Sequence, residues 1–318
     1  MHVVQVSWLR GAAVHTDMGY AGIERVARTL SLELVRQGHK VTLIAPPGSA
    51  LDGVEVIETN DFDEAARIIP SLKADVVHSH EVWAIESVMR RGLSVPMLAS
   101  THVTEPIGYH KNVVYLSEAQ KKYHKGAAEA PIVRVPTDPT LHPKGLPKQD
   151  YLLFLGMGAP WKGVHRAARV ACLLDRKLIV AGPCSGDYRA ELEHFKCIEF
   201  VGEVRDPYRS ELIEQAYAMM CLHGNENGWY EPGAGVIGEA GAFNVPVAAT
   251  PNGCLEEIVL DGENGWNGRT VEEVAFKMID QPTLLDPGRL ARTEWSAENV
   301  TKQYLALYEK VIGGATWQ

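Results

Sequence analysis

Residues 231–239 read Glu-Pro-Gly-Ala-Gly-Val-Ile-Gly-Glu, and the chain continues Ala-Gly-Ala-Phe-Asn-Val-Pro-Val. Two carboxylates eight residues apart bracket a glycine-rich segment, after which small and apolar residues predict a helix over 235–243 and a strand over 245–249. Backbone N–H groups at a helix start attract anions, and glycines let an anion approach closely. The segment therefore predicts an anion site between Glu231 and Glu239.

Strands and helices alternate on both sides of this segment. In the second half, we predict strands over 151–155, 177–181, 198–201 and 219–222, with helices over 164–174 and 207–218. In the first half, we predict a helix from Ile23 to Gly38 and strands over 3–8, 40–45, 54–57, 76–78, 97–100, 113–116 and 132–135. This alternation predicts an α/β fold with parallel sheets covered on both faces.

A proline-rich stretch divides the chain. Residues 136–148 carry four prolines among polar residues, which suits an extended connection. The 318 residues are enough for two domains. We expect Rossmann-like domains over 1–140 and 149–295, with a last helix within 296–318 that crosses back onto the first domain.

Composition narrows the class of protein. The net charge is −9, whereas binding to a phosphate backbone needs a clustered basic surface, so we expect no nucleic-acid partner. No apolar stretch approaches membrane-spanning length, and the N-terminus lacks a signal-peptide pattern. The five cysteines are an odd number without C-x-x-C spacing. We therefore expect a cytoplasmic protein with reduced thiols and no integral membrane association.

Residues 231–249 resemble the donor-site signature of retaining GT-B glycosyltransferases of the family-4 type, and the resemblance covers nearly the whole chain. It implies two Rossmann-like domains that face each other across a cleft. It also implies a nucleotide-diphosphate-sugar donor, a small-molecule, lipid or saccharide acceptor, and transfer with retention of anomeric configuration. Members of this family characteristically need no metal ion, and we expect no cofactor.

The resemblance gives roles to the residues of this motif. Glu231 would accept hydrogen bonds from hydroxyls of the reacting sugar, whereas Glu239 would bind the ribose diol. The backbone N–H groups near Gly233, Ala234 and Gly235 would face outward, toward the diphosphate.

Residues 156–163 read Gly-Met-Gly-Ala-Pro-Trp-Lys-Gly and follow the strand predicted over 151–155. They resemble the family's Gly-Arg-…-Lys-Gly turn, which implies that Lys162 neutralises the donor diphosphate. Met157 replaces an arginine that usually binds the same group. The segment is neither a dinucleotide fingerprint, because Trp161 occupies the third glycine position, nor a P-loop, because Gly163 follows the lysine.

Other segments resemble further parts of the family's donor site. Gly22 belongs to a loop similar to the family's Gly-Gly loop and would let the backbone meet the phosphates. His102, after the strand predicted over 97–100, would contact the sugar near the reacting carbon. Glu203 and Val204 match the position at which the family holds the base through backbone groups.

Structural explanations compete with these roles. Glu231 alone is explained as a surface charge near a helix start, Lys162 as an exposed turn residue, and Gly22 as a strand-to-helix turn. Glu239 lies among small apolar residues, where an unpaired carboxylate is costly. A metal site at His78, His80 and His102 is disfavoured because no acidic partner has ligand spacing.

Two other functions fit the same features. A nucleotide-sugar epimerase would use a similar donor cleft but needs an acid and a base that act on the sugar. A nucleotide-sugar-binding protein without catalysis is the other alternative, because Met157 replaces a cation.

Overall fold

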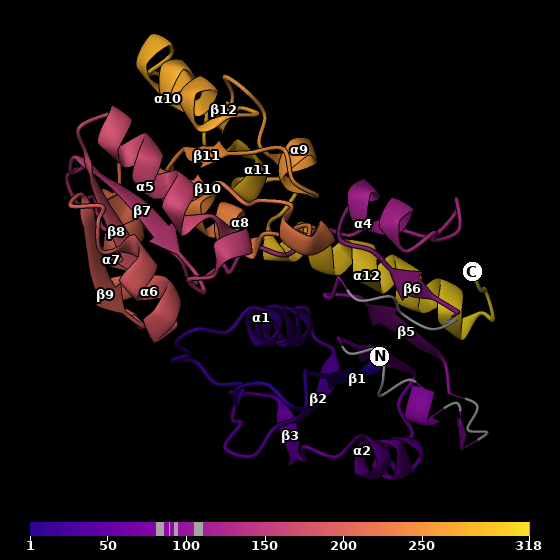
Figure 1. Ribbon diagram of the computed structural model, residues 1–318. Coiled ribbons are helices and arrows are strands. Elements are labelled where there is room, and N and C mark those ends of the chain that lie inside the picture. The colour runs from indigo at the N-terminus through magenta and orange to yellow at the C-terminus, as the bar shows by residue number, and fades with distance from the viewer. Residues whose placement is uncertain (81–85, 89, 92–94, 105–110, 318) are drawn as a thin grey trace. The chain divides into compact units, whose positions relative to one another are not determined.

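The computed structural model describes residues 1–80, 86–88, 90–91, 95–104 and 111–317. The chain forms two compact units (Figure 1). Unit 1 comprises Met1–Pro136 and Ser296–Gln318, and unit 2 comprises Thr137–Trp295. Unit 2 is therefore inserted, in sequence, between the two parts of unit 1.

Unit 1 contains a parallel six-stranded sheet within its described residues. Its strands are β1 (His2–Val6), β2 (Lys40–Ala45), β3 (Glu55–Glu58), β4 (Val76–Ser79), β5 (Met97–Ser100) and β6 (Val113–Val114). Its helices include α1 (Ile23–Arg36), α2 (Phe62–Ile68), the 3-10 helix η1 (Ile69–Leu72), α4 (Glu118–Tyr123) and α12 (Ala297–Ile312). The strand order is β3-β2-β1-β4-β5-β6, the Rossmann order, in which the connections reverse direction between β1 and β4.

Alternating side chains along β1 bury both faces of this sheet. Val3 belongs to an apolar cluster with Leu30 of α1 and Tyr304 of α12. Val4 belongs to a second cluster with Ala65 of α2. The C-terminal helix α12 thus completes the core of unit 1, although about 160 residues of unit 2 separate it from the rest of that unit.

Unit 2 repeats the same architecture. Its strands are β7 (Tyr151–Leu155), β8 (Lys177–Ala181), β9 (Ile198–Gly202), β10 (Ala218–Cys221), β11 (Val247–Ala249) and β12 (Gly265–Asn267). Its helices include η2 (Pro160–Lys162), α5 (Val164–Leu173), α6 (Gly186–Leu192), α7 (Tyr208–Gln215), η3 (Glu226–Gly228), α8 (Gly235–Ala242), α9 (Leu255–Ile258), α10 (Val271–Asp280) and α11 (Arg289–Arg292). The order β12-β11-β10-β7-β8-β9 is again the Rossmann order, with the reversal between β7 and β10.

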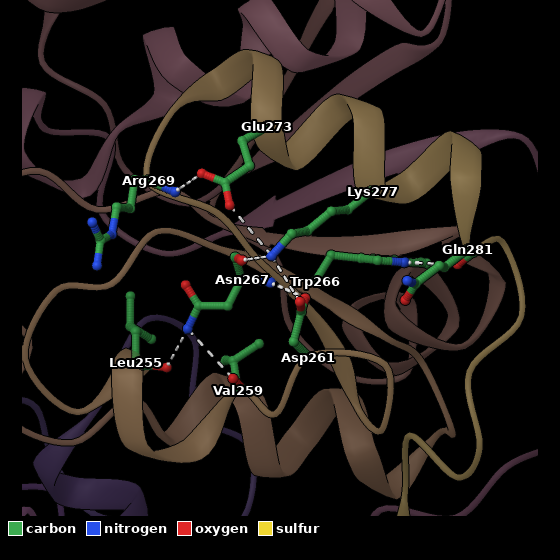
Figure 2. A network of polar contacts seen from close by, with 9 residues as sticks. All are labelled: Leu255, Val259, Asp261, Trp266, Asn267, Arg269, Glu273, Lys277 and Gln281. Atoms are coloured by element: carbon green, nitrogen blue, oxygen red, sulfur yellow. Dashed lines mark hydrogen bonds and ion pairs between the residues drawn. The ribbon is translucent and has the colours of Figure 1, made fainter.

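A polar network ties the last strand of unit 2 to its neighbouring helices (Figure 2). The Lys277 ammonium of α10 donates to Asp261 Oδ2 at 2.7 Å and to the Asn267 carbonyl oxygen at 2.6 Å. The Asn267 amide in turn donates to the Leu255 carbonyl oxygen of α9 at 3.1 Å. β12 is short, so these side chains supplement its few ladder hydrogen bonds.

The strands predicted over 40–45, 97–100 and 177–181 coincide with β2, β5 and β8. The strand predicted over 132–135 is wrong, because the structure has only an isolated bridge between Tyr115 and Ile132 there. Pro131 and Pro136 flank this stretch and lack the N–H group that a longer ladder needs.

Among the residues that the structure describes, no helix combines the length and the apolar character needed to cross a bilayer.

Candidate active site

The candidate site of unit 2 lies where the strand connections reverse direction. β7 leads into the turn that carries Lys162, and β10 ends at Cys221, two residues before His223. The loop after His223 continues through Glu231 to the start of α8. Open α/β sheets bind ligands beyond the carboxyl ends of their strands at such a point.

Lys162, His223 and Glu231 form a compact charged cluster there. The Lys162 Nζ donates to Glu231 Oε2 at 2.5 Å and lies 4.6 Å from the centre of the Trp229 ring. The His223 Nδ1 lies 3.0 Å from the same carboxylate oxygen. The side chain of Glu231 is only 7% exposed, and that of Lys162 is 21% exposed. A carboxylate buried this deeply is stable because it is paired.

Burial and charge act in opposite directions on Glu231. Burial raises the pKa of its carboxyl. The Lys162 ammonium and the His223 ring lower this pKa by a larger amount, so that its net value is about 2. Burial and the nearby Lys162 charge lower the pKa of His223. At neutral pH the cluster therefore contains an ionised Glu231 and a neutral His223.

Two glycines make this arrangement possible. Gly163 has a φ of 76°, and a Cβ at this position would lie 1.9 Å from the Leu222 carbonyl oxygen. Gly253 has a φ of 59°, and its Cβ would lie 2.2 Å from the Glu231 carbonyl oxygen. Both positions need glycine for its left-handed conformation and for the close approach of backbone. Because Gly163 can approach the Leu222 backbone closely, the preceding Lys162 lies beside the carboxyl end of β10.

Asn252 holds the backbone of the loop that carries Glu231. Its Oδ1 accepts the Glu231 N–H at 2.8 Å, and its Nδ2 donates to the Gly224 carbonyl oxygen at 2.7 Å. The Cys254 N–H donates to the Glu231 carbonyl oxygen at 2.8 Å. The Glu231 backbone is thus fixed on both its N–H and its C=O side.

The start of α8 differs from the expectation. The Ala234 N–H donates to the Cys254 sulfur at 3.3 Å, and the Gly235 N–H donates to the Gly233 carbonyl oxygen at 3.1 Å. These two N–H groups are therefore engaged within the chain, contrary to the prediction that they face outward. Cys254 follows the tight turn at Gly253, and this turn brings its sulfur to the helix start.

Glu239 forms an ion pair with Arg209 of α7. The two side chains are 14% and 7% exposed, respectively. The argument that Glu239 would be a costly unpaired carboxylate is therefore wrong, because α7 supplies its counter-charge. The guanidinium Nη1 of Arg209 is buried and has no hydrogen-bond partner among the described residues.

The remaining predicted site residues lie on several elements. Glu203 is exposed just after β9, and the following Val204 is buried in the core of unit 2. Met157 is partly buried in the turn after β7. In unit 1, Gly22 is the exposed N-cap of α1, with a φ of −94°, and a Cβ there would meet no atom within 4 Å. His102 follows β5 and is partly exposed.

Sequence reasoning missed His223, Trp229 and Arg209 as partners of the predicted residues. His223 lies two residues beyond the end of the parallel strand β10, as His102 does beyond β5, so the strand-end rule that singled out His102 applies to it as well. Arg209 carries no comparable signal, because its pairing with Glu239 depends on the packing of α7 beside α8.

Within the described parts of the chain, no group of three or more His, Cys, Asp or Glu side chains has the geometry of a metal site.

The sequence matches two family descriptions. Residues 20–134 match Glycosyltransferase Family 4, and residues 149–280 match Glycosyl transferases group 1. A search of the curated proteins found no match.

Solved structures give the same assignment. AviGT4, a glycosyltransferase involved in avilamycin A biosynthesis, is 30% identical, with a TM-score of 0.89 and 99% of each chain covered. HepE from Anabaena, solved with UDP and glucose, is 16% identical, with a TM-score of 0.72, and the match covers 98% of this chain and 100% of HepE. Sucrose-phosphate synthase from Thermosynechococcus elongatus is 15% identical, with a TM-score of 0.77, and the match covers 99% of this chain and 100% of that enzyme.

The last two proteins share the fold with this chain, whereas AviGT4 is similar in both sequence and fold. Two parallel sheets in Rossmann order are the framework of that shared fold. The chain belongs to the glycosyltransferases of the family-4 type and has the GT-B fold.

Proposed function

We propose that this glycosyltransferase moves a sugar from a nucleotide-diphosphate donor to a hydroxyl-bearing acceptor, with retention of anomeric configuration and without a metal ion. The observation that carries the proposal is the buried cluster of Lys162, Glu231 and His223 at the reversal point of the unit 2 sheet. The fold of HepE, solved with UDP and glucose, supports a nucleotide-sugar donor. The similarity to AviGT4 favours a small natural product as the acceptor.

Lys162 is assigned to the donor diphosphate. An ammonium group has three hydrogens, and Glu231 takes one of them in the structure. We assign this ammonium group to the oxygens of the departing phosphate, whose negative charge grows as the bond to the sugar breaks. A positioned cation stabilises that charge most in the transition state, which is the role that a metal ion would otherwise fill.

The reaction breaks the bond between the sugar C1 and the phosphate oxygen and forms a bond from C1 to the acceptor oxygen on the same face. The acceptor hydroxyl proton must then leave. Glu231, with its pKa held at about 2, is a weak base. The departing phosphate oxygen is therefore the proposed proton acceptor, and Glu231 instead accepts hydrogen bonds from sugar hydroxyls.

Glu239 is assigned to the ribose diol. Its carboxylate has two oxygens and accepts from Arg209 with Oε2, so hydroxyl donors can use its further lone pairs. The Arg209 guanidinium fixes the orientation of the carboxylate before the nucleotide binds, which reduces the entropy cost of binding.

The other assignments follow the family resemblance. Glu203 and Val204 hold the base through backbone groups, and the segment from Gly233 through Ala234 to Gly235 lies at the diphosphate. In unit 1, Gly22 meets the phosphates, which is supported by the open space at the position of its missing Cβ. His102 contacts the donor sugar.

A thermal-shift screen of nucleoside diphosphates and nucleotide sugars tests donor binding first. A ligand at about 100 times its dissociation constant stabilises the protein by about 2.7 kcal/mol. The donor identified in this way is then incubated with candidate hydroxyl acceptors in excess chelator, and the anomeric configuration of the product is read by NMR. Inversion would overturn the retaining proposal, and activity that requires an added divalent cation would overturn the metal-free one.

A further inference from the structure

A buried chain of hydrogen bonds leads from His102 into the core of unit 1. His102 Nε2 lies 3.2 Å from His80 Nδ1, and His80 Nε2 lies 2.7 Å from Gln5 Oε1. The Gln5 amide nitrogen donates to the Tyr308 hydroxyl at 3.2 Å. His80, Gln5 and Tyr308 are each at most 2% exposed, so water does not compete for these groups.

The chain joins elements that are far apart in the sequence. Gln5 is the penultimate residue of β1, His80 directly follows β4, and His102 follows β5. Tyr308 belongs to the C-terminal helix α12, and its hydroxyl also lies 2.7 Å from His78 Nδ1. Unit 1 therefore supplies every member of the chain.

The three histidines are neutral at physiological pH. Burial lowers the pKa of His78 to about 3 and that of His102 to about 4. Burial, together with the neighbouring rings of His78 and His102, holds the pKa of His80 well below its ordinary value. A neutral imidazole carries one hydrogen, so each ring has one donor nitrogen and one acceptor nitrogen.

The hydrogen bond to Gln5 determines the tautomer of His80, that is, which ring nitrogen carries the hydrogen. The amide nitrogen of Gln5 faces Tyr308 and is also 3.5 Å from His78 Nδ1, so the amide oxygen is the end that faces His80. An oxygen without hydrogen can only accept, which requires the hydrogen of His80 on Nε2. His80 Nδ1 is then the acceptor, and His102 must donate to it from Nε2.

We propose that Gln5, acting through His80, fixes His102 as the tautomer with its hydrogen on Nε2, so that Nδ1 of His102 accepts a hydrogen bond from a hydroxyl of the donor sugar. The inference rests on the proposed contact between His102 and the sugar. No described residue hydrogen-bonds to His102 Nδ1. Gln5, His80 and Tyr308 are positioning residues in this scheme, because they act on the sugar only through His102.

The tautomer can be observed without any measurement of activity. The full chain is labelled with ¹⁵N-histidine, and long-range ¹H–¹⁵N spectra are recorded at pH 7.5, with His102→Gln used to assign the signals of His102. We expect the hydrogen of His102 on Nε2. A hydrogen on Nδ1 would overturn the inference, whatever the enzyme's turnover.

A matched pair of substitutions tests whether Gln5 is the cause. Gln5→Met keeps an unbranched side chain but removes the acceptor, so His102 should show both tautomers. Gln5→Glu keeps an acceptor toward His80 and should preserve the Nε2–H tautomer. If Gln5→Met leaves the tautomer unchanged in a folded protein, Gln5 does not set it and the inference fails.

Kinetics separate this inference from the proposed function. In Gln5→Met, kcat should fall about tenfold, the equivalent of one lost hydrogen bond, while nucleoside diphosphate affinity stays the same. If the tautomer shifts and kcat is unchanged, the tautomer assignment stands and the proposed role of His102 on the sugar fails.

Discussion

Lys162 Nζ lies 2.5 Å from Glu231 Oε2, so the cation assigned to the phosphates and the carboxylate assigned to the sugar form an ion pair with each other. Each group compensates the charge of the other in a site where water has little access. The donor would therefore enter a site whose charges are balanced and whose side chains are held in place.

Removing one member of this pair should destabilise unit 2. In Lys162→Met, the buried Glu231 loses its counter-charge, and we expect a loss of about 3 kcal/mol in the free energy of unfolding. The double variant Lys162→Met/Glu231→Gln should lose less than the sum of the single variants. Chemical denaturation of the wild type, the two single variants and the double variant measures this coupling.

Glu272→Gln, which breaks an exposed pair with Arg169, is the control and should change stability by less than about 0.5 kcal/mol. Additive losses would mean that the Lys162–Glu231 pair does not contribute to stability.

The two glutamates of the motif should have separable effects on function. Glu239→Gln removes the charge assigned to the ribose and should weaken nucleoside diphosphate binding about tenfold. Glu231→Gln should leave this affinity within about twofold but lower kcat, because its partner is the reacting sugar. Calorimetry and steady-state rates distinguish the two variants. If Glu239→Gln lowers only the melting temperature, Glu239 is a structural partner of Arg209.

Met157→Arg should tighten binding of the diphosphate. The family usually has an arginine at this position, and a charge-assisted hydrogen bond contributes about 1.5–3 kcal/mol. We therefore expect affinity for the nucleoside diphosphate to rise about tenfold. The matched variant Met157→Gln lacks the charge and should bind as the wild type does. Calorimetry at equal salt concentration makes the comparison, because salt screens the added charge. Equal affinity of Met157→Arg and Met157→Gln would show that the new cation does not reach the diphosphate.

The neutral histidines of unit 1 should make stability depend on pH. Burial lowers the pKa of His78 to about 3, whereas an unfolded histidine has a pKa of about 6.5. As the pH falls below about 6.5, His78 becomes protonated in the unfolded chain but stays neutral in the folded protein. The free energy of unfolding therefore decreases. Between pH 7.5 and 5.0 the expected loss from this residue is about 2 kcal/mol.

The comparison with His78→Asn isolates this contribution. Denaturation of both proteins at the two pH values should show a pH-dependent loss that is smaller in the variant by about 2 kcal/mol. Glu231 does not interfere, because its pKa of about 2 places its titration below this pH window. An equal loss in both proteins would show that His78 is protonated in the folded state.

The regular parts of the fold were predictable from the sequence, because strands such as β2 and β8 consist mainly of apolar residues and end at glycine or at a turn. β12 was not predicted, since its three residues have no pattern of their own and depend on the contacts of Lys277 and Asn267. The helix α12 was predicted as an element within residues 296–318. The structure adds that the Tyr308 hydroxyl of α12 lies within hydrogen-bond distance of Gln5 in β1 and His78 in β4.

The candidate site was predictable only in part, for a related reason. The motif residues Glu231 and Lys162 stand out in the sequence, but they are 69 residues apart, and no local pattern indicates that they form an ion pair. The pairing of Glu239 with Arg209 and the bond from Ala234 to the Cys254 sulfur depend on how loops pack, which no local pattern encodes. Local sequence thus indicates which residues carry chemistry, whereas their partners follow from tertiary structure.

The two ends of unit 2 are joined to each other, since the Thr137 N–H donates to the Trp295 carbonyl oxygen at 2.7 Å. A domain whose two ends lie close together can be replaced by a related domain without a change in the structure into which it is inserted. Chimeras that import the counterpart of unit 2 from a related enzyme should therefore be spliced at both junctions, 136/137 and 295/296. A single crossover in the proline-rich stretch would import a foreign C-terminal helix as well. Such a hybrid would place an unmatched residue against Gln5, where Tyr308 now lies, and would disturb unit 1, which the experiment meant to keep.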